Sequence, residues 1–180
     1  MILPILGTPC SGKSTLLKYV LAELDPPEHI EPMKLFLCQK HDDILVIGRY
    51  SSTSETFGGT DRLSYGTIPK FASFIDEQIK NYRHIIFEGD RFTSCVEALT
   101  EKYECKVFIL TVSLEEELRR HKERKDNQTY SWLAGRRTQL ANLQNNLYLR
   151  EHLLVRPNKT MEDSEKIKKE IKKYLTIVAT

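Results

Sequence analysis

The sequence lacks clustered cysteines and histidines. Four cysteines and five histidines are scattered through its 180 residues, without a C-x-x-C pair or a histidine ladder. Zinc sites and disulfide frameworks both depend on such clustering. We therefore expect neither a zinc module nor a disulfide-stapled domain, and reduced thiols in a cytoplasmic protein are the simplest interpretation.

Long hydrophobic runs and a strong charge of one sign are also absent. No segment approaches the roughly 18 apolar residues of a membrane span, and the N-terminal residues lack the basic lead and cleavage site of a signal peptide. The formal net charge of +2 falls well short of the basic bias of a dedicated nucleic-acid-binding protein. We expect a cytoplasmic protein without a membrane partner, forming one domain over residues 1–180.

What is present is an alternation of strand-like and helix-like segments. Strand patterns occupy residues 1–6, 84–87, 106–112 and 153–155, and helical patterns occupy 13–24, 69–82, 96–102, a segment from Leu114, 132–147 and a C-terminal segment from Met161. Two further strands, 34–38 and 44–48, flank a polar turn and predict a β-hairpin. This order predicts an α/β fold with a parallel sheet flanked by helices on both faces.

Two prolines lie at informative places in this map. Pro4 stands inside the first predicted strand, although proline cannot donate to a strand ladder. Pro69 is expected at the first position of a helix, where its missing N–H has no cost.

A glycine-rich loop joins the first predicted strand to the first predicted helix. Residues 7–14 match G-x-x-x-x-G-K-S, in which backbone N–H groups and the lysine surround a phosphate and the serine binds Mg²⁺. The helix start adds unpaired donors and a positive dipole end. A chance match is the alternative, and the strand-to-helix context argues against it. The predicted ATP-binding residues are Gly7, Thr8, Pro9, Cys10, Ser11, Gly12, Lys13, Ser14 and Thr15.

Three classes of protein use such a loop: kinases, GTPase switches, and ATP-driven motors or regulators. A GTPase usually carries N-K-x-D to bind guanine, but after Asn158 and Lys159 the acid position is taken by Met161. Motors usually need a larger domain and a partner subunit. The kinase class is therefore favoured.

Acidic residues at the end of the H-I-I-F strand support that choice. Glu88 and Asp90 resemble a Walker B site, in which a carboxylate holds Mg²⁺ at the carboxyl edge of the sheet. A solvated turn is the alternative. Arg91 and Phe92 complete D-R-F, which is similar to the D-R-aromatic signature of thymidylate kinases. The predicted metal-binding residues are Ser14, Glu88 and Asp90.

A basic segment at about residues 119–137 resembles the lid of monophosphate kinases, whose arginines close over ATP and neutralise the transferred phosphoryl group. Arg124 and Arg136 are the predicted lid arginines. An ordinary helix end rich in cations is the alternative.

The loop F-G-G-T-D-R-L-S-Y at residues 57–65 has an unusual composition. Gly58 and Gly59 permit a steep turn or a close approach to a substrate. Asp61 and Arg62 could combine a general base with an anion clamp. The alternative is an exposed turn in which these two side chains only pair with each other. The predicted catalytic residues are Lys13, Asp61, Arg124 and Arg136.

Four motifs together carry a family resemblance: G-T-P-C-S-G-K-S-T, I-G-R-Y followed by F-G-G-T-D-R-L-S, the apolar strand into E-G-D-R, and A-G-R-R-T-Q-L-A-N-L. In these motifs, which extend from Gly7 to about Leu143, the chain resembles a phage-associated group of P-loop kinases. The group contains 5-hydroxymethyluracil DNA kinases, which phosphorylate a hydroxymethyl group on a DNA base. Arg137 and Gln139 depart from the acidic and basic residues typical of that group.

The resemblance implies a P-loop NTPase fold with an added β-hairpin and a basic helical lid, using ATP and Mg²⁺ at residues 7–15. It places Asp61 and Arg62 on the acceptor side. The predicted substrate-binding residues are Gly58, Gly59, Thr60, Asp61, Arg62, Ser64 and Arg91.

The sequence thus predicts an ATP-dependent kinase that phosphorylates a hydroxyl of a 5-hydroxymethyluracil-type base in DNA or of a nucleotide. A nucleoside or nucleoside-monophosphate kinase acting on free nucleotides is one alternative, and an ATP-binding regulatory module without transferase activity is another. If a phage encodes the chain, we expect the protein in the cytoplasm of the host cell. The pattern leaves open which of Asp61, Glu88 and Asp90 is the base and which binds metal, and it predicts no oligomeric state.

Overall fold

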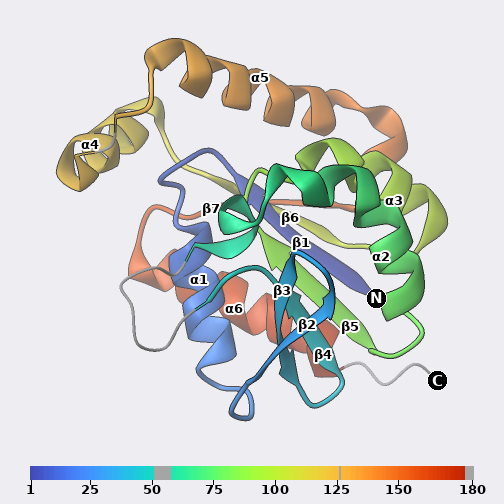
Figure 1. Ribbon diagram of the computed structural model, residues 1–180. Coiled ribbons are helices and arrows are strands. Elements are labelled where there is room, and N and C mark those ends of the chain that lie inside the picture. The colour runs from blue at the N-terminus through green and yellow to red at the C-terminus, as the bar shows by residue number, and fades with distance from the viewer. Residues whose placement is uncertain (51–57, 126, 177–180) are drawn as a thin grey trace.

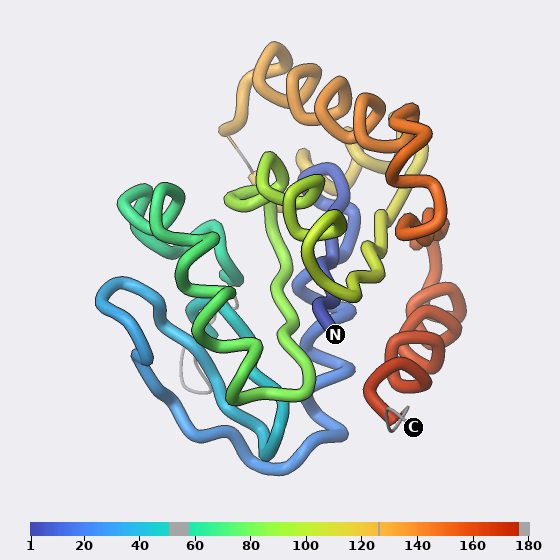
Figure 2. Tube along the Cα trace, turned by 90° about the vertical axis from the view of Figure 1, so that its right-hand side faces the viewer, coloured from blue at the N-terminus to red at the C-terminus, as the bar shows by residue number. Residues whose placement is uncertain are grey.

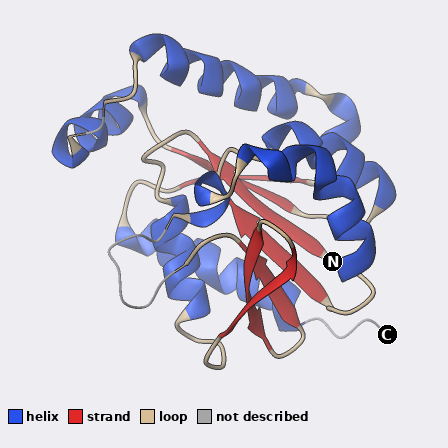
Figure 3. Cartoon of the chain, in the orientation of Figure 1, coloured by secondary structure: helices blue, strands red, loops and turns tan. Residues whose placement is uncertain are grey.

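A mostly parallel sheet forms the centre of the molecule (Figures 1 and 3). The computed structural model describes residues 1–50, 58–125 and 127–176, and in it seven strands follow the order β2-β3-β4-β5-β1-β6-β7. The five parallel strands are β4 (Ile44–Ile47), β5 (His84–Glu88), β1 (Ile2–Gly7), β6 (Val107–Thr111) and β7 (Leu153–Pro157). Two antiparallel neighbours, β3 (Phe36–His41) and β2 (Glu28–Met33), extend the sheet at one edge.

Helices cover both faces of this sheet, as predicted. Alternate residues of each central strand point to opposite faces, so Leu3 and Ile5 lie in one core cluster while Ile2 and Leu6 lie in the other. Helices α1 (Lys13–Leu21) and α6 (Met161–Thr176) cover the first face. Helices α2 (Phe71–Gln78), α3 (Val96–Lys102) and α5 (Tyr130–Asn145) cover the second, and Figure 2 shows α2 and α3 on the far side of the strands from α6. Helix α4 (Leu114–Arg124) joins β6 to α5.

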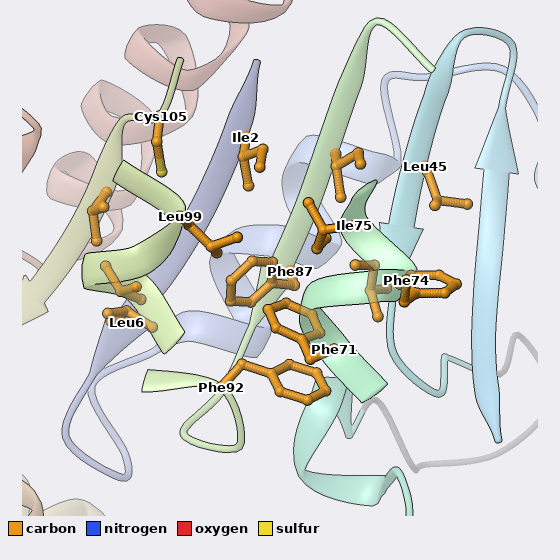
Figure 4. Close-up of a cluster of buried hydrophobic side chains, with 14 of the residues drawn as sticks. Ile2, Leu6, Leu45, Phe71, Phe74, Ile75, Phe87, Phe92, Leu99 and Cys105 are labelled. Carbon is orange, nitrogen blue, oxygen red and sulfur yellow. The ribbon is translucent and has the colours of Figure 1, made fainter. Parts of the chain in front are cut away.

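An aromatic stack anchors the turn that follows β5 (Figure 4). Phe92, just after this turn, stacks on Phe71 of α2 with 3.7 Å between ring centroids, and Phe87 of β5 meets both rings edge-on. All three side chains are fully buried. Each contributes roughly 1.5–3 kcal/mol by burial, so the ends of the turn that carries Asp90 are held firmly in the core.

Helix termini follow the local capping signals of the sequence. The Ser113 hydroxyl accepts the Glu116 N–H at 3.2 Å and starts α4 at Leu114, and the Thr160 hydroxyl accepts the Asp163 N–H at 3.2 Å before α6. Ile167, in the first half of α6, is buried as its spacing predicts.

Three details differ from the sequence map or qualify it. Strand β2 was not predicted, because it is a half-exposed edge strand with a register shift and an internal Pro32, and its stability comes from pairing with β3. Pro4 does lie in β1, where the pairing with β6 begins only at Ile5. Pro69 does not open a helix: it lies in the 3₁₀ turn η2 (Tyr65–Lys70), and α2 begins at Phe71.

Two predicted segments are only partly covered. Phe57 of the predicted 57–65 loop and Asp126 of the predicted lid lie outside the described residues. Within the described ranges, no helix is both long and apolar enough to cross a bilayer.

Candidate active site

The glycine-rich loop lies at the carboxyl end of β1, between β5 and β6, where the strand order of the sheet reverses. Gly12 precedes α1 with φ 91°, and a Cβ atom there would lie 2.5 Å from Asn158 Nδ2. Glycine is therefore required at this position both by conformation and by the close approach of Asn158.

Lys13 is held against the loop by hydrogen bonds. Its buried ammonium donates to the carbonyls of Gly7 at 2.8 Å and Thr8 at 3.0 Å and lies 3.8 Å from Asp90 Oδ1. The positive charge is thus positioned between the loop and the end of β5, where a bound phosphate would meet it.

Two carboxylates from the end of β5 face the loop. The Ser14 hydroxyl donates to Glu88 Oε1 at 3.0 Å, and Glu88 is only 2% exposed. Burial raises the pKa of the Glu88 carboxyl to about 7, although the Lys13 ammonium acts in the opposite direction. Burial likewise raises the pKa of Asp90. The desolvation of these carboxylates is therefore only partly offset by the one lysine.

This donor set fits a magnesium ion. Among the described residues, no three or more His, Cys, Asp or Glu side chains cluster as a complete metal cage. Mg²⁺ is usually held by one or two carboxylates together with substrate phosphates and waters. Ser14, Glu88 and Asp90 supply that incomplete set, and a cation beside them would satisfy carboxylates that burial otherwise disfavours.

The glycine-rich turn at residues 58–62 is locked onto the end of β5. The Thr60 hydroxyl donates to the Glu88 carbonyl at 2.8 Å, and Asp61 Oδ1 accepts the backbone N–H groups of Asp90 at 2.8 Å and Arg91 at 3.1 Å. Gly59 has φ 55°, and a Cβ there would fall on Glu88 Oε1. This loop therefore positions the carboxylates beside the phosphate-binding loop.

Three cavities meet at this edge of the sheet. The phosphate-loop cavity, of about 150 Å³, is lined by Pro9, Cys10, Gly12, Lys13, Ser14, Asp61, Glu88, Asp90, Arg124, Gln128 and Trp132. The arginine cavity, of about 400 Å³, is lined by Asp61, Tyr65, Ile68, Asp90, Arg91, Ser94, Gln128, Trp132, Arg136 and Gln139. The α6 cavity, of about 280 Å³, is lined by Cys10, Gly12, Thr15, Arg120, Glu123, Arg124, Asn158, Lys159, Thr160, Met161 and Ser164.

Two arginines in the arginine cavity have unused donors. The Arg91 guanidinium lies 3.7 Å from the centroid of the Tyr65 ring and donates to the Asp61 carbonyl at 2.6 Å. The Arg136 guanidinium lies 5.5 Å from the Trp132 ring. Among the described residues, Arg91 Nε, Arg91 Nη1 and Arg136 Nε are buried without a hydrogen-bond partner. Buried donors of this kind are strong sites for an anion.

The predicted lid residues divide into two groups. Arg124 lines the phosphate-loop cavity and Arg136 lines the arginine cavity, and their roles in transfer stay predictions. By contrast, Arg119 pairs with Glu116 and Arg137 pairs with Glu117 on the helices themselves.

Some predicted acceptor residues lie away from the cavities. Arg62 lines none of the three cavities described above; its side chain covers Gly58, and within the described chain no ion pair joins it to Asp61. Ser64 caps the turn η2 by accepting the Gly66 N–H at 3.2 Å. Gly59 and Thr60 contact Glu88 at the end of β5 and line none of the three cavities.

Sequence reasoning missed two residues that hold the loop. Asn158 Nδ2 donates to the Ser11 carbonyl at 2.8 Å, and the Arg120 guanidinium donates to the Cys10 carbonyl at 3.1 Å. Asn158 was considered only as part of a guanine motif, and Arg120 stood in a run of basic residues. Neither signal reveals a bond to a loop more than a hundred residues away.

Comparison with known protein families supports this reading of the geometry. The model of the family described as P-loop Nucleotide Kinase3 matches residues 1–173. A comparison with curated proteins gave no match. The mostly parallel sheet, the phosphate loop at its switch point and the family match establish an α/β P-loop NTPase fold. The chain belongs to the P-loop Nucleotide Kinase3 family.

Proposed function

We propose that the chain is an ATP-dependent kinase that transfers the γ-phosphoryl group to a hydroxyl of a nucleotide unit bound in the arginine cavity. The observation that carries this proposal is the shared wall of two cavities: Asp61 and Asp90 line both the phosphate-loop cavity and the arginine cavity. A donor phosphate and an acceptor hydroxyl would meet at that wall, as phosphoryl transfer requires.

Each side chain at the wall has a separate task. Lys13 and Arg124 neutralise charge on the donor phosphates. Asp61, whose Oδ1 is pinned by two backbone N–H groups, orients the acceptor hydroxyl and accepts its proton. The hydroxyl oxygen then bonds to the γ-phosphorus while the bond from that phosphorus to the β–γ bridging oxygen breaks, leaving ADP.

Magnesium would be held by Ser14 with Glu88 or Asp90. When bound, it supplies charge neutralisation for the β- and γ-phosphate oxygens. The remaining work of orientation is done by this chain's own loop, and the brace from Asn158 to the Ser11 carbonyl keeps that loop in place.

The leading acceptor is a hydroxymethylated pyrimidine in DNA, which the motif resemblance favours. Tyr65 and Trp132 at the arginine cavity are 77% and 40% exposed, so their rings are accessible for stacking on a base. A free nucleotide is the second candidate, because the unused donors of Arg91 and Arg136 suit a single phosphate clamp.

Incubation with γ-labelled ATP and three acceptor sets tests the proposal: hydroxymethylated DNA, ordinary DNA and a panel of nucleosides and nucleotides. We expect label on the hydroxymethylated DNA and not on ordinary DNA. Label on free nucleotides alone would support the second candidate. ATP binding without label on any acceptor would overturn the kinase proposal and favour a regulatory module.

A matched pair of variants ties any label to this site. Lys13→Met removes the loop ammonium and should abolish transfer. Lys18→Met alters an exposed lysine of the same helix and should leave transfer unchanged. Equal transfer by both variants would show that a contaminating kinase is responsible.

A further inference from the structure

The α6 cavity borders the phosphate-loop cavity, whereas a further cavity of about 270 Å³ touches the loop at Thr8 but shares no lining residue with the phosphate-loop cavity. The α6 cavity shares Cys10, Gly12 and Arg124 with the phosphate-loop cavity, and it shares no lining residue with the arginine cavity. The carboxylates that face the transferred phosphate lie toward the arginine cavity. The opposite end of the same triphosphate, which carries the sugar and base, is therefore directed to the α6 cavity.

In the backbone of residues 158–160, which lines this cavity, every N–H and C=O group already has a hydrogen-bond partner. The Asn158 N–H donates to the Thr111 carbonyl at 2.9 Å, and the Asn158 and Lys159 carbonyls accept Arg120 Nη2 at 3.3 and 2.9 Å. The N–H groups of Lys159 and Thr160 donate to Asp163 Oδ2 at 3.0 and 2.9 Å. The Thr160 carbonyl accepts the Ser164 N–H at 3.2 Å.

The Asn158 side chain is equally engaged. It is 3% exposed, donates through Nδ2 to the Ser11 carbonyl at 2.8 Å and accepts the Ser164 hydroxyl through Oδ1 at 2.6 Å. The asparagine that begins an apparent N-K-x-D pattern thus faces the phosphate loop and its own helix. It braces the loop, and at 3% exposure it presents almost no surface to a base edge.

Two further polar side chains that line the cavity are not exposed, and both are engaged: the half-buried Arg120 guanidinium binds Glu116 and the carbonyls of Cys10, Asn158 and Lys159, and the buried Ser164 hydroxyl donates to Asn158 Oδ1. The remaining polar side chains lie at the exposed rim: Thr15, Glu123, Arg124, Lys159 and Thr160. Exposed groups exchange hydrogen bonds with water whichever base is present, so they discriminate weakly. Strong discrimination between bases requires buried polar groups that the wrong base leaves unpaired. Arg124 and Met161 also line the cavity, and stacking on a guanidinium or contact with a thioether suits any base.

We propose that the α6 cavity holds the nucleobase of the phosphate donor without reading its hydrogen-bonding edge, so that ATP, GTP, CTP and UTP serve as donors with similar efficiency. This inference rests on the proposed kinase function, because it assigns the donor's base to one of the two outer cavities. Affinity for the donor then comes mainly from the phosphate loop.

Nucleotide binding tests this separately from transfer. Trp132 is the single tryptophan of the chain and lines the phosphate-loop cavity, so its fluorescence reports occupancy. We expect the four magnesium nucleoside triphosphates to bind with dissociation constants within about tenfold of one another. A preference of more than about a hundredfold for one base would overturn the inference. Equal binding of the four nucleotides without transfer from any of them would contradict the proposed kinase function but would still support an unselective base site.

A substitution at Met161 tests whether Asn158 is available to bind a guanine base. Met161→Asp completes N-K-x-D, and the residue is 58% exposed at the start of α6, where an acid is tolerated. Because Asn158 is held by Ser11 and Ser164, we expect the variant to bind GTP and ATP within about tenfold of one another. Met161→Leu, which keeps an apolar contact, is the control. A gain of a hundredfold or more for GTP in Met161→Asp alone would contradict the inference.

Discussion

At the scale of single residues, Asp61 holds the turn after β5 and is also the acceptor-side base that we propose. Replacing it by Asn keeps the Oδ1 atom that accepts the Asp90 and Arg91 N–H groups but removes the negative charge and the proton acceptor. We expect Asp61→Asn to lower phosphoryl transfer by roughly a hundredfold or more, with ATP binding unchanged. Rates of label transfer and quenching of Trp132 fluorescence measure the two effects.

The control for this variant is Asp42→Asn, at the tip of the turn between β3 and β4. Asp42 has φ 51°, a conformation that Asn tolerates well. Transfer by Asp61→Asn at close to the wild-type rate would show that Asp61 is only a turn residue.

Glu88 illustrates how a buried carboxylate opposes stability. Its pKa is raised by burial from 4.5 to about 7, so the folded protein holds this proton more tightly than the unfolded chain. The stability that the protonated carboxyl gives the folded protein is fully present below about pH 4.5 and is lost as the pH rises through 7, where the buried group ionises. Glu88→Gln stays neutral and should raise the free energy of unfolding at pH 8 by up to about 3 kcal/mol, with no change at pH 4.5.

Urea unfolding without nucleotide and with a chelator measures this effect at both pH values. Glu101→Gln, at an exposed position of α3, should change neither value. Phosphoryl transfer by Glu88→Gln should fall sharply if Glu88 binds the metal ion as we propose. The stability difference between Glu88→Gln and wild type should be larger at pH 8 than at pH 4.5. An equal difference at the two pH values would contradict the burial argument.

At the scale of elements, two glycines should respond oppositely to alanine. A Cβ on Gly59 would fall on Glu88 Oε1 at a backbone φ of 55°, so Gly59→Ala should push the turn away from β5. We expect a loss of roughly 1–3 kcal/mol of stability and at least about tenfold in transfer, because the carboxylates move away from the phosphate loop.

Gly135→Ala provides the matched control within helix α5. Nothing lies within 4 Å of a Cβ at this position, and alanine favours a helix over glycine by about 1 kcal/mol. The variant should therefore be more stable than wild type, with transfer retained. Thermal unfolding of the two variants gives the comparison, and similar shifts in the same direction would show that neither site behaves as its geometry implies.

At the scale of the whole molecule, the modest net charge of +2 makes salt dependence informative about the acceptor. Binding of a DNA strand neutralises several phosphates and releases counterions, whereas a single nucleotide phosphate needs only one clamp. With hydroxymethylated DNA, we expect the apparent affinity to fall by at least about tenfold between 50 and 200 mM salt, as three or more phosphate contacts require. The KM for ATP measures the salt effect on the donor alone.

A flat salt profile with DNA would contradict contact with the strand beyond the reacting unit. It would direct attention to short oligonucleotides and free nucleotides as acceptors. The family match by itself is compatible with either DNA or a free nucleotide as the acceptor.

Local patterns were sufficient for much of this protein. The period of the apolar residues predicted the parallel strands, the hairpin and most helices, because each depends on neighbours a few residues away. The spacing of Gly7, Gly12 and Lys13 located the phosphate loop for the same reason.

Only the tertiary structure decided how these parts meet. Asn158 reaches Ser11 across 147 positions and Asp61 holds Asp90 across 29, and no local pattern encodes either contact. The same holds for β2, which depends on its partner strand. The sequence by itself determined the phosphate loop and the alternation of strands and helices, whereas folding decided that the turn at Gly59 positions the carboxylates and that Asn158 braces the loop, because hydrogen bonds between distant segments exist only once the sheet has brought them together.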